Sequence, residues 1–142
     1  MVKMIVDATN AIAGRLASVV AKKALLGEDV VVLNSEKAVI SGNKRWIIEK
    51  FKERRLRGHP YKGPFYPSRP DRVLRRMIRG MLPRKTARGR AAFRRVMCYV
   101  GVPDEFKDKE CVKIKEADAG KLKTIKFIKL GDLCKEIGWK GK

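Results

Sequence analysis

The sequence predicts an α/β fold, and three observations support this. Short runs of β-branched residues alternate with longer segments whose apolar side chains recur every three to four positions. Two of these runs, at 4–6 and 30–33, flank a helical segment, which is the pattern of a strand–helix–strand unit with parallel strands. The chain has 142 residues, 44% of them hydrophobic, so it can bury a core, and we expect one domain over residues 1–142.

The first predicted helix follows the strand at 4–6. Thr9 or Asn10 is a suitable N-cap, because a short polar side chain accepts hydrogen bonds from the free amides of the first turn. Leu16 and Val20 belong to its apolar stripe, and Gly27 suits its end. The continuously apolar run at 30–33 is typical of a strand covered on both faces, and residues 39–40 add a further extended piece.

A second helix is predicted over residues 44–57, after a start signal at 41–43 and before Gly58. Its apolar residues are expected to face the core, Trp46 among them, while its arginines and lysines face outward. Trp139, near the other end of the chain, is expected at the surface.

Residues 58–70 predict an irregular, stiff arm. They contain four of the six prolines and two glycines, so neither a regular helix nor a central strand can form there. Tyr61, Phe65 and Tyr66 are interleaved with Lys62 and Arg69. Such a mixture suits RNA, whose exposed bases stack on aromatic rings while cations meet the backbone.

Two amphipathic basic helices are expected after the arm. The first starts with Asp71 as its cap and is broken by Pro83, and the second covers residues 84–95. A strand at 96–99, a possible edge strand at 111–114, an alternating run at 123–129 and a closing helix at 130–137 complete the chain.

The charge of the chain is concentrated in its middle. Of the net charge of +20, residues 44–95 supply nearly all, with nineteen Lys and Arg against three acidic residues, and 14 of the 15 arginines lie there. A solvated face mixes both signs, whereas this segment does not. The arginine fork binds phosphate through two hydrogen bonds and stacks on bases, so the segment is predicted to contact a polyanion.

Nucleic acid is favoured over a membrane as that polyanion. A helix at a membrane surface would carry bulky apolar residues opposite its cations over a long stretch, and no apolar run approaches the roughly 18 residues of a membrane span. Cys98, Cys111 and Cys134 form no C-x-x-C pair, which favours a reducing compartment and, with a single histidine, excludes ordinary zinc sites.

Catalytic motifs are missing from the sequence. No G-x-G-x-x-G follows the first strand and no G-x-x-x-x-G-K-[ST] occurs anywhere. The turn from Asp7 to Asn10 could present helix amides to a phosphate, but these side chains more often satisfy backbone donors at such a turn. His59 is expected to stack on or hydrogen-bond to RNA rather than act as a base. We therefore expect no enzyme, no cofactor, no metal site and no small-molecule substrate.

Three blocks of the sequence resemble one family. They are DATNAIAGRLAS at residues 7–18, VVVLNSEKAVISG at 30–42, and IRGMLP at 78–83 followed by Gly89, Arg90 and the strand at 96–99. In this order they resemble large-subunit ribosomal protein thirteen. The chain lacks the insertion before the second strand and the His-Pro-His stretch that mark the bacterial pattern, so it resembles the archaeal and eukaryotic branch.

The resemblance implies a three-layer α/β/α domain with a mostly parallel sheet of about four strands, bound to 23S-type rRNA. It further implies a cytoplasmic location in the large ribosomal subunit, neighbouring large-subunit proteins as partners and no enzymatic activity. Arg15, the GMLP segment and the Gly89–Arg90 pair would lie at the RNA contact.

The charge pattern and the resemblance together give the candidate RNA-binding residues. They are Arg15, Lys44, Arg45, Arg54, Arg55, Arg57, His59, Tyr61, Lys62, Tyr66, Arg69, Arg72, Arg75, Arg76, Arg79, Arg84, Lys85, Arg88, Gly89, Arg90, Arg94 and Arg95. Two other hypotheses stay open at this point: a nucleotide-dependent or RNA-modifying enzyme on the same α/β opening, and a DNA-compacting protein.

Overall fold

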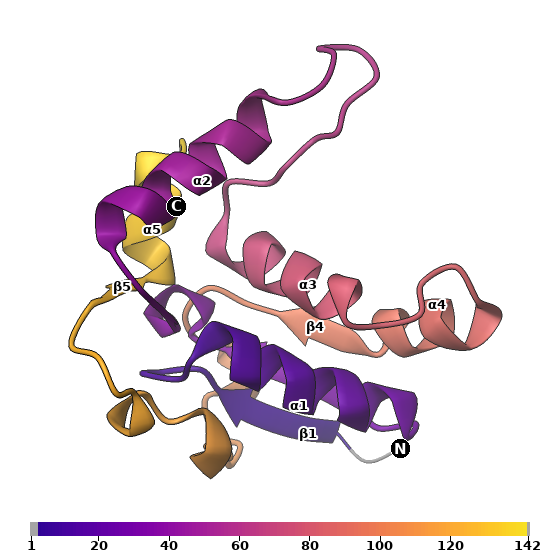
Figure 1. Ribbon diagram of the computed structural model, residues 1–142. Helices are drawn as coiled ribbons and strands as arrows, with labels where there is room; N and C mark the ends of the chain where they lie inside the picture. Colours follow the sequence, from indigo (N-terminus) through magenta and orange to yellow (C-terminus); the bar gives the residue numbers. More distant parts are fainter. Residues whose placement is uncertain (1–2, 142) are drawn as a thin grey trace.

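A computed structural model describes residues 3–141 and has a three-stranded parallel sheet at its centre (Figure 1). Strand β2 (Asp29–Leu33) lies between β1 (Lys3–Asp7) and β4 (Val96–Cys98). Helix α1 (Ala13–Leu25) connects β1 to β2, whose register pairs Ile5 with Val31. The predicted strand–helix–strand unit and the α/β class are confirmed.

The sheet has three full strands where about four were expected. Val112, in the expected edge strand, makes an isolated parallel bridge with Val6. Its N–H donates to the Ile5 carbonyl at 2.8 Å, and its own carbonyl accepts from the Asp7 N–H at 3.0 Å. The fourth position, at the outer edge of β1, is therefore held by a single residue.

The two faces of the sheet are covered unequally. Val6, Val32 and Val96 point to the main core, which contains buried residues of α1, α3 (Pro70–Gly80) and α4 (Ala87–Arg94). The opposite face carries Ile5, Val31 and Leu33, which pack with Phe106 and Tyr99. The third layer of the expected α/β/α arrangement is thus a short 3₁₀ turn (Asp104–Phe106) rather than an α-helix.

A second, two-stranded sheet lies beside the first. In it, β3 (Val39–Ser41) pairs antiparallel with β5 (Phe127–Lys129), so only the last three residues of the alternating run at 123–129 form a strand. Helix α5 (Leu130–Glu136) follows β5 and contacts both α2 (Lys44–Leu56) and α3. Figure 1 shows α2 and the loop after it extending away from the central sheet.

Three helices begin at residues other than those that the sequence indicates: α1 and α4 begin later, and α3 begins earlier. Helix α1 starts at Ala13 without a side-chain cap, because Ala11 and Ile12 first form bridges with Asp118 and Val39. Helix α3 starts at Pro70, with Asp71 in its first turn, and α4 starts at Ala87 after the cap Thr86. Proline at the first helical position costs no hydrogen bond, which explains the earlier start of α3.

The two tryptophans exchange their expected places. Trp46 is 57% exposed, with the Lys50 ammonium 4.8 Å from its ring centre, whereas Trp139 is partly buried and packs against the main core. The expected core position of Trp46 is therefore wrong. Helix α2 buries only Ile47 and Phe51 in the core, with Ile48 partly buried against it, because most of its length lies beyond the sheet.

Candidate nucleic-acid interface

All the candidate residues except Arg15 lie on four consecutive parts of the chain: the helix α2 with its C-cap, the arm at 58–69, the helix α3, and the segment from the turn before α4 to the C-cap of α4 (Figure 1). We call these parts together the basic face. The exposed candidates are Arg15, Lys44, Arg45, Arg55, Arg57, His59, Tyr61, Lys62, Arg69, Arg72, Arg84, Lys85, Arg88, Arg90 and Arg94. Those partly buried are Arg54, Tyr66, Arg75, Arg76, Arg79 and Arg95, and Gly89 is buried.

Few carboxylates neutralise the basic face. Within residues 44–95, all of which the structure describes, the ion pairs are Arg45–Glu49 at 3.3 Å, Arg57–Glu53 at 2.6 Å and Arg69–Asp71 at 3.5 Å. The first two join exposed side chains one helical turn apart, and such pairs contribute little to stability. Most of the arginines in this segment therefore have no carboxylate partner, and folding leaves their charge available to a ligand.

The arm is held at its base by two arginines from different helices. Arg55 of α2 donates from Nη1 to the Tyr66 carbonyl at 3.3 Å. Arg76 of α3 donates from Nη1 to the Phe65 carbonyl at 3.2 Å, and its guanidinium carbon lies 4.0 Å from the Tyr66 ring centre. These contacts fix the returning half of the arm between α2 and α3.

The tip of the arm is a closed turn. The His59 N–H donates to the Gly63 carbonyl at 3.0 Å, and the Gly63 N–H donates to the His59 carbonyl at 2.9 Å. Gly58 has φ +92°, and a Cβ there would overlap the Gly63 carbonyl, so the turn requires glycine at this position. The closure leaves Tyr61 87% exposed, with its ring centre 5.5 Å from that of His59.

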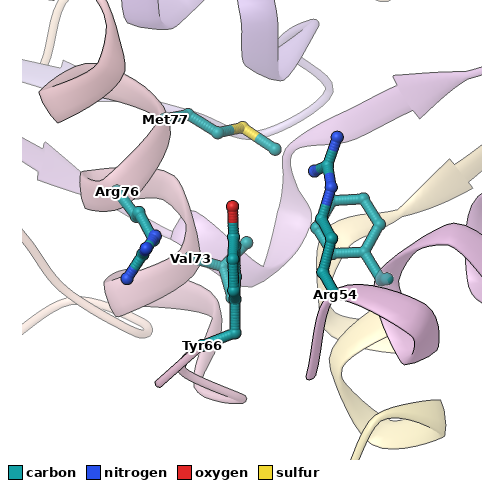
Figure 2. A pocket seen from close by; sticks show the side chains of 6 residues that line it. Arg54, Tyr66, Val73, Arg76 and Met77 are labelled. Atoms are coloured by element: carbon teal, nitrogen blue, oxygen red, sulfur yellow. The ribbon is translucent and has the colours of Figure 1, made fainter. Parts of the chain in front are cut away.

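A small cavity lies where α2, the arm and α3 meet. Its volume is about 110 Å³, and its lining consists of Phe51, Arg54, Tyr66, Val73, Arg76 and Met77. Figure 2 shows the Tyr66 ring standing between the side chains of Arg76 and Arg54. Because α2 and α3 are distant in sequence, periodicity alone could not predict this cavity.

The outer side of α3 forms an arginine-lined groove of about 420 Å³. Its lining includes four arginines of this one helix together with Pro67 and Phe93, the arginines being Arg72, Arg75, Arg76 and Arg79. Burial lowers the pKa of Arg79, and the neighbouring guanidinium groups of Arg84 and Arg76 lower it further. Arginine remains charged under all ordinary conditions, so this crowding of like charges favours the binding of an anion.

Arg75 and Arg95 have internal roles. Arg75 donates from Nε to the Val96 carbonyl at 3.0 Å and from Nη2 to the Phe93 carbonyl at 3.2 Å, and it lies over the Phe93 ring. Arg95 donates from Nη1 to the Ala24 carbonyl at 2.9 Å. Both guanidinium groups therefore join elements of the fold and use part of their donors on backbone carbonyls.

Gly89 also serves the fold. A Cβ at this position would overlap the Pro83 carbonyl oxygen, and the Gly89 N–H donates to the Thr86 hydroxyl at 3.1 Å. The turn between α3 and α4 is thus tight because residue 89 has no side chain. Its effect on the basic face is indirect, since it sets the positions of the exposed Arg88 and Arg90.

The turn after β1 is occupied by its own hydrogen bonds. Asp7 Oδ1 accepts from the Thr9 N–H at 3.0 Å, the Thr9 hydroxyl at 2.7 Å and the Asn34 amide at 3.1 Å. Burial raises the pKa of Asp7, but these hydrogen bonds and the nearby Lys113 outweigh it, so the pKa is lower than usual. A carboxylate held ionised in this turn would repel a phosphate.

The buried thiols are unreactive. Burial raises the pKa of Cys98 and of Cys134 to about 12, so each is protonated at neutral pH. Between residues 3 and 141 no group of three His, Cys, Asp or Glu side chains comes together as metal ligands. No helix in the same range is long and apolar enough to cross a membrane.

The fold and this surface define the class of protein: a small α/β structure with one strongly cationic face. Within that class, the chain belongs to the ribosomal protein L13 family, whose sequence pattern matches residues 2–105. As a member it is a structural, non-enzymatic protein of the ribosome, in the cytoplasm. The resemblance drawn from the three sequence blocks is confirmed, and the hypothesis of an enzyme is not.

Similar proteins from archaea cover nearly the whole chain. The large ribosomal subunit protein uL13 of Methanopyrus kandleri is 49% identical over 95% of this chain and 86% of its own length. The protein of the same name from Methanosarcina barkeri is 49% identical over 96% of this chain and 98% of its own length. The protein of the same name from Archaeoglobus fulgidus is 44% identical over 96% of this chain and 88% of its own length. The archaeal branch agrees with the prediction.

Proposed function

We propose that the chain is a constituent of the large ribosomal subunit and that its basic face binds and positions 23S-type rRNA during assembly. The observation that carries this proposal is the charge of residues 44–95, where nineteen cations meet three carboxylates. Family membership supplies the large subunit as the setting. Neighbouring large-subunit proteins are further expected partners.

Binding in this proposal is positioning and charge neutralisation. The sheet and the helices packed on it form a rigid base, and the arginines of α3 and of the turn into α4 meet phosphates from it. Arg55 and Arg76 each hold the arm through one N–H group, so the other donors of their guanidinium groups remain for RNA. Pre-set arginines lose less conformational entropy on binding than flexible lysines would.

The salt dependence of binding to a large-subunit rRNA fragment tests the proposal. If six to ten cations contact phosphates, affinity falls by about 10³ to 10⁵ between 50 and 200 mM salt, on the scaling for duplex DNA. Arg15, in the first turn of α1, belongs to a different part of the chain, and removing it is expected to reduce that dependence by about one phosphate contact. A flat response to salt would contradict the proposal.

A competition experiment separates this role from DNA compaction. We expect the rRNA fragment to displace the chain from duplex DNA of equal length and charge, because the arm offers exposed aromatic rings that suit unpaired bases. Equal competition by both nucleic acids would favour the DNA-compacting alternative.

A further inference from the structure

We propose that the cavity between α2, the arm and α3 binds one unpaired base of the RNA, stacked on Tyr66. The inference rests on the proposed function, since the base belongs to the strand that the basic face would hold. It goes beyond charge, because it assigns a defined site for a single base.

The geometry around Tyr66 suits a stacked ring. One face of the Tyr66 ring is covered by the Arg76 guanidinium, 4.0 Å from the ring centre, and Arg54 stands on its other side (Figure 2). The Arg54 guanidinium carbon is itself 5.1 Å from the Phe51 ring centre. A planar base entering the space between Tyr66 and Arg54 would therefore meet an aromatic face and a second flat cation.

The size of the cavity selects a base rather than a whole nucleotide. A water molecule needs about 10–15 Å³ of such space, so the cavity, at about 110 Å³, has room for a flat ring. It is well below the roughly 300 Å³ at which pockets begin to enclose drug-sized ligands. The sugar and phosphate would stay outside.

The surroundings suit a phosphate at the mouth of the cavity. Arg76 lines both the cavity and the arginine groove on the outer side of α3, so the two spaces share one wall. A strand whose base enters the cavity would lay its phosphates along Arg72 and Arg79 in that groove. Val73 and Met77 give the cavity an apolar side, and no carboxylate lines it. An aromatic side chain of a neighbouring protein would leave these cations without an anion.

Binding of an rRNA fragment with single abasic positions tests the site. The fragment is one that the wild-type chain protects in footprinting, and each protected nucleotide is replaced in turn by an abasic one. We compare wild type with Tyr66→Leu, which removes the ring, and with Tyr66→Phe, which retains it. Tyr61→Leu is the comparison variant: Tyr61 is exposed at the arm tip and does not line the cavity, so any loss of binding that it causes should be independent of the abasic position that is coupled to Tyr66.

We expect Tyr66→Leu to weaken binding by about 5- to 150-fold, the range that stacking of one base supplies. The loss should be the same at low and high salt, since no phosphate contact is removed. One abasic position should cost wild type the same factor and cost Tyr66→Leu nothing, while Tyr66→Phe retains the wild-type affinity. Thermal unfolding of each variant shows whether it is folded.

Three results would overturn the inference. The first is that no abasic position is coupled to Tyr66, and the second is that Tyr66→Leu lowers the salt dependence, as expected if the ring only anchors the arm. The third is unchanged rRNA affinity with impaired incorporation into the subunit, which would indicate a protein in the cavity. If wild type itself shows no salt-dependent rRNA binding, the proposed function fails, and the base site fails with it.

Discussion

At the scale of single residues, arginines of the same segment have different structural roles. Arg88 is exposed on α4 and Arg72 lines the outer groove, whereas Arg75, three positions after Arg72, uses two donors on backbone carbonyls. The charge pattern predicted the segment correctly as cationic and largely unpaired by acids. It could not separate arginines that face solvent from those that bind backbone, because that depends on which carbonyls the tertiary fold brings near.

Arg75→Ala and Arg88→Ala are expected to give opposite results. Arg75→Ala removes two hydrogen bonds from a charged donor to the Val96 and Phe93 carbonyls, so it should lower the free energy of unfolding by about 2–3 kcal/mol. Arg88→Ala should change stability by less than about 0.5 kcal/mol, as at other exposed sites, and weaken rRNA binding. Urea unfolding and a binding titration of both variants measure this. Equal stability of the two variants would contradict the internal role of Arg75.

Two helical glycines provide a second contrast. Gly89→Ala places a methyl group against the Pro83 carbonyl and should destabilise the protein by about 1–3 kcal/mol, the usual cost of overpacking. Gly14→Ala adds a methyl group to α1 that has no neighbouring atom within 4 Å, so it should stabilise the protein by about 0.5–1 kcal/mol. Thermal unfolding of both compares the two directly. A neutral Gly89→Ala would show that the turn into α4 can move apart without cost.

Asp7 predicts a dependence of stability on acid pH. Its pKa is lower in the folded chain than in the unfolded chain, so the unfolded state binds the proton more readily. The stabilisation from ionised Asp7 is complete above its pKa in the unfolded chain, about 4, and is lost as the pH falls through its pKa in the folded chain. Urea unfolding from pH 6 downward should show a smaller acid-induced loss in Asp7→Asn than in wild type. An identical loss would mean that other carboxylates account for the effect.

At the scale of elements, the pattern of the sequence predicted the helices and the sheet strands, but it missed where several of them begin. The first helix was expected to follow Thr9 or Asn10, yet Asn10 adopts φ +56° and its N–H donates to the Lys37 carbonyl. Residues in the next positions bridge to β3 and to the segment around Asp118 before α1 starts. Such long-range partners override a local capping signal.

The arm is joined to the neighbouring helices at its base. Two arginine–carbonyl hydrogen bonds hold its base, and replacing both in Arg55→Ala/Arg76→Ala should loosen it. Trypsin is then expected to cleave after the exposed Lys62 faster than in wild type, with little change in the thermal unfolding midpoint, because the core is untouched. Arg57→Ala is the control, since among residues 3–141 the side chain of Arg57 hydrogen-bonds to Glu53 and not to the arm. Unchanged cleavage in the double variant would show that the proline-rich sequence alone fixes the arm.

At the scale of the whole molecule, the pairing of distant segments was beyond prediction. The sequence indicates extended pieces at 39–40 and 123–129, but not that they pair with each other, since a period of two residues fixes which face is buried and not which partner is adjacent. The cavity at Tyr66 was missed for the same reason, although the aromatic residues of the arm had been selected. Of the candidate site, the composition was therefore predictable and the arrangement was not.

The C-terminal segment is expected to be essential for the fold, although the family pattern ends at residue 105. Leu130, Leu133 and Ile137 are buried in the main core, and β5 pairs with β3. Loss of one such side chain costs about 2–5 kcal/mol, so losing all three costs as much as the about 5–15 kcal/mol that stabilises a domain.

A chain ending at residue 106 should therefore show no cooperative thermal transition by circular dichroism. Removing only residues 141–142, which follow Ile137, the last buried residue of the part of the chain that the structure describes, should leave the transition in place. This control separates loss of the core from a general effect of shortening the chain. If the chain ending at residue 106 unfolds with the wild-type midpoint, then β3 and the region of α2 that α5 covers are stable without the C-terminal segment. In that case the basic face would need no support from the C-terminal third.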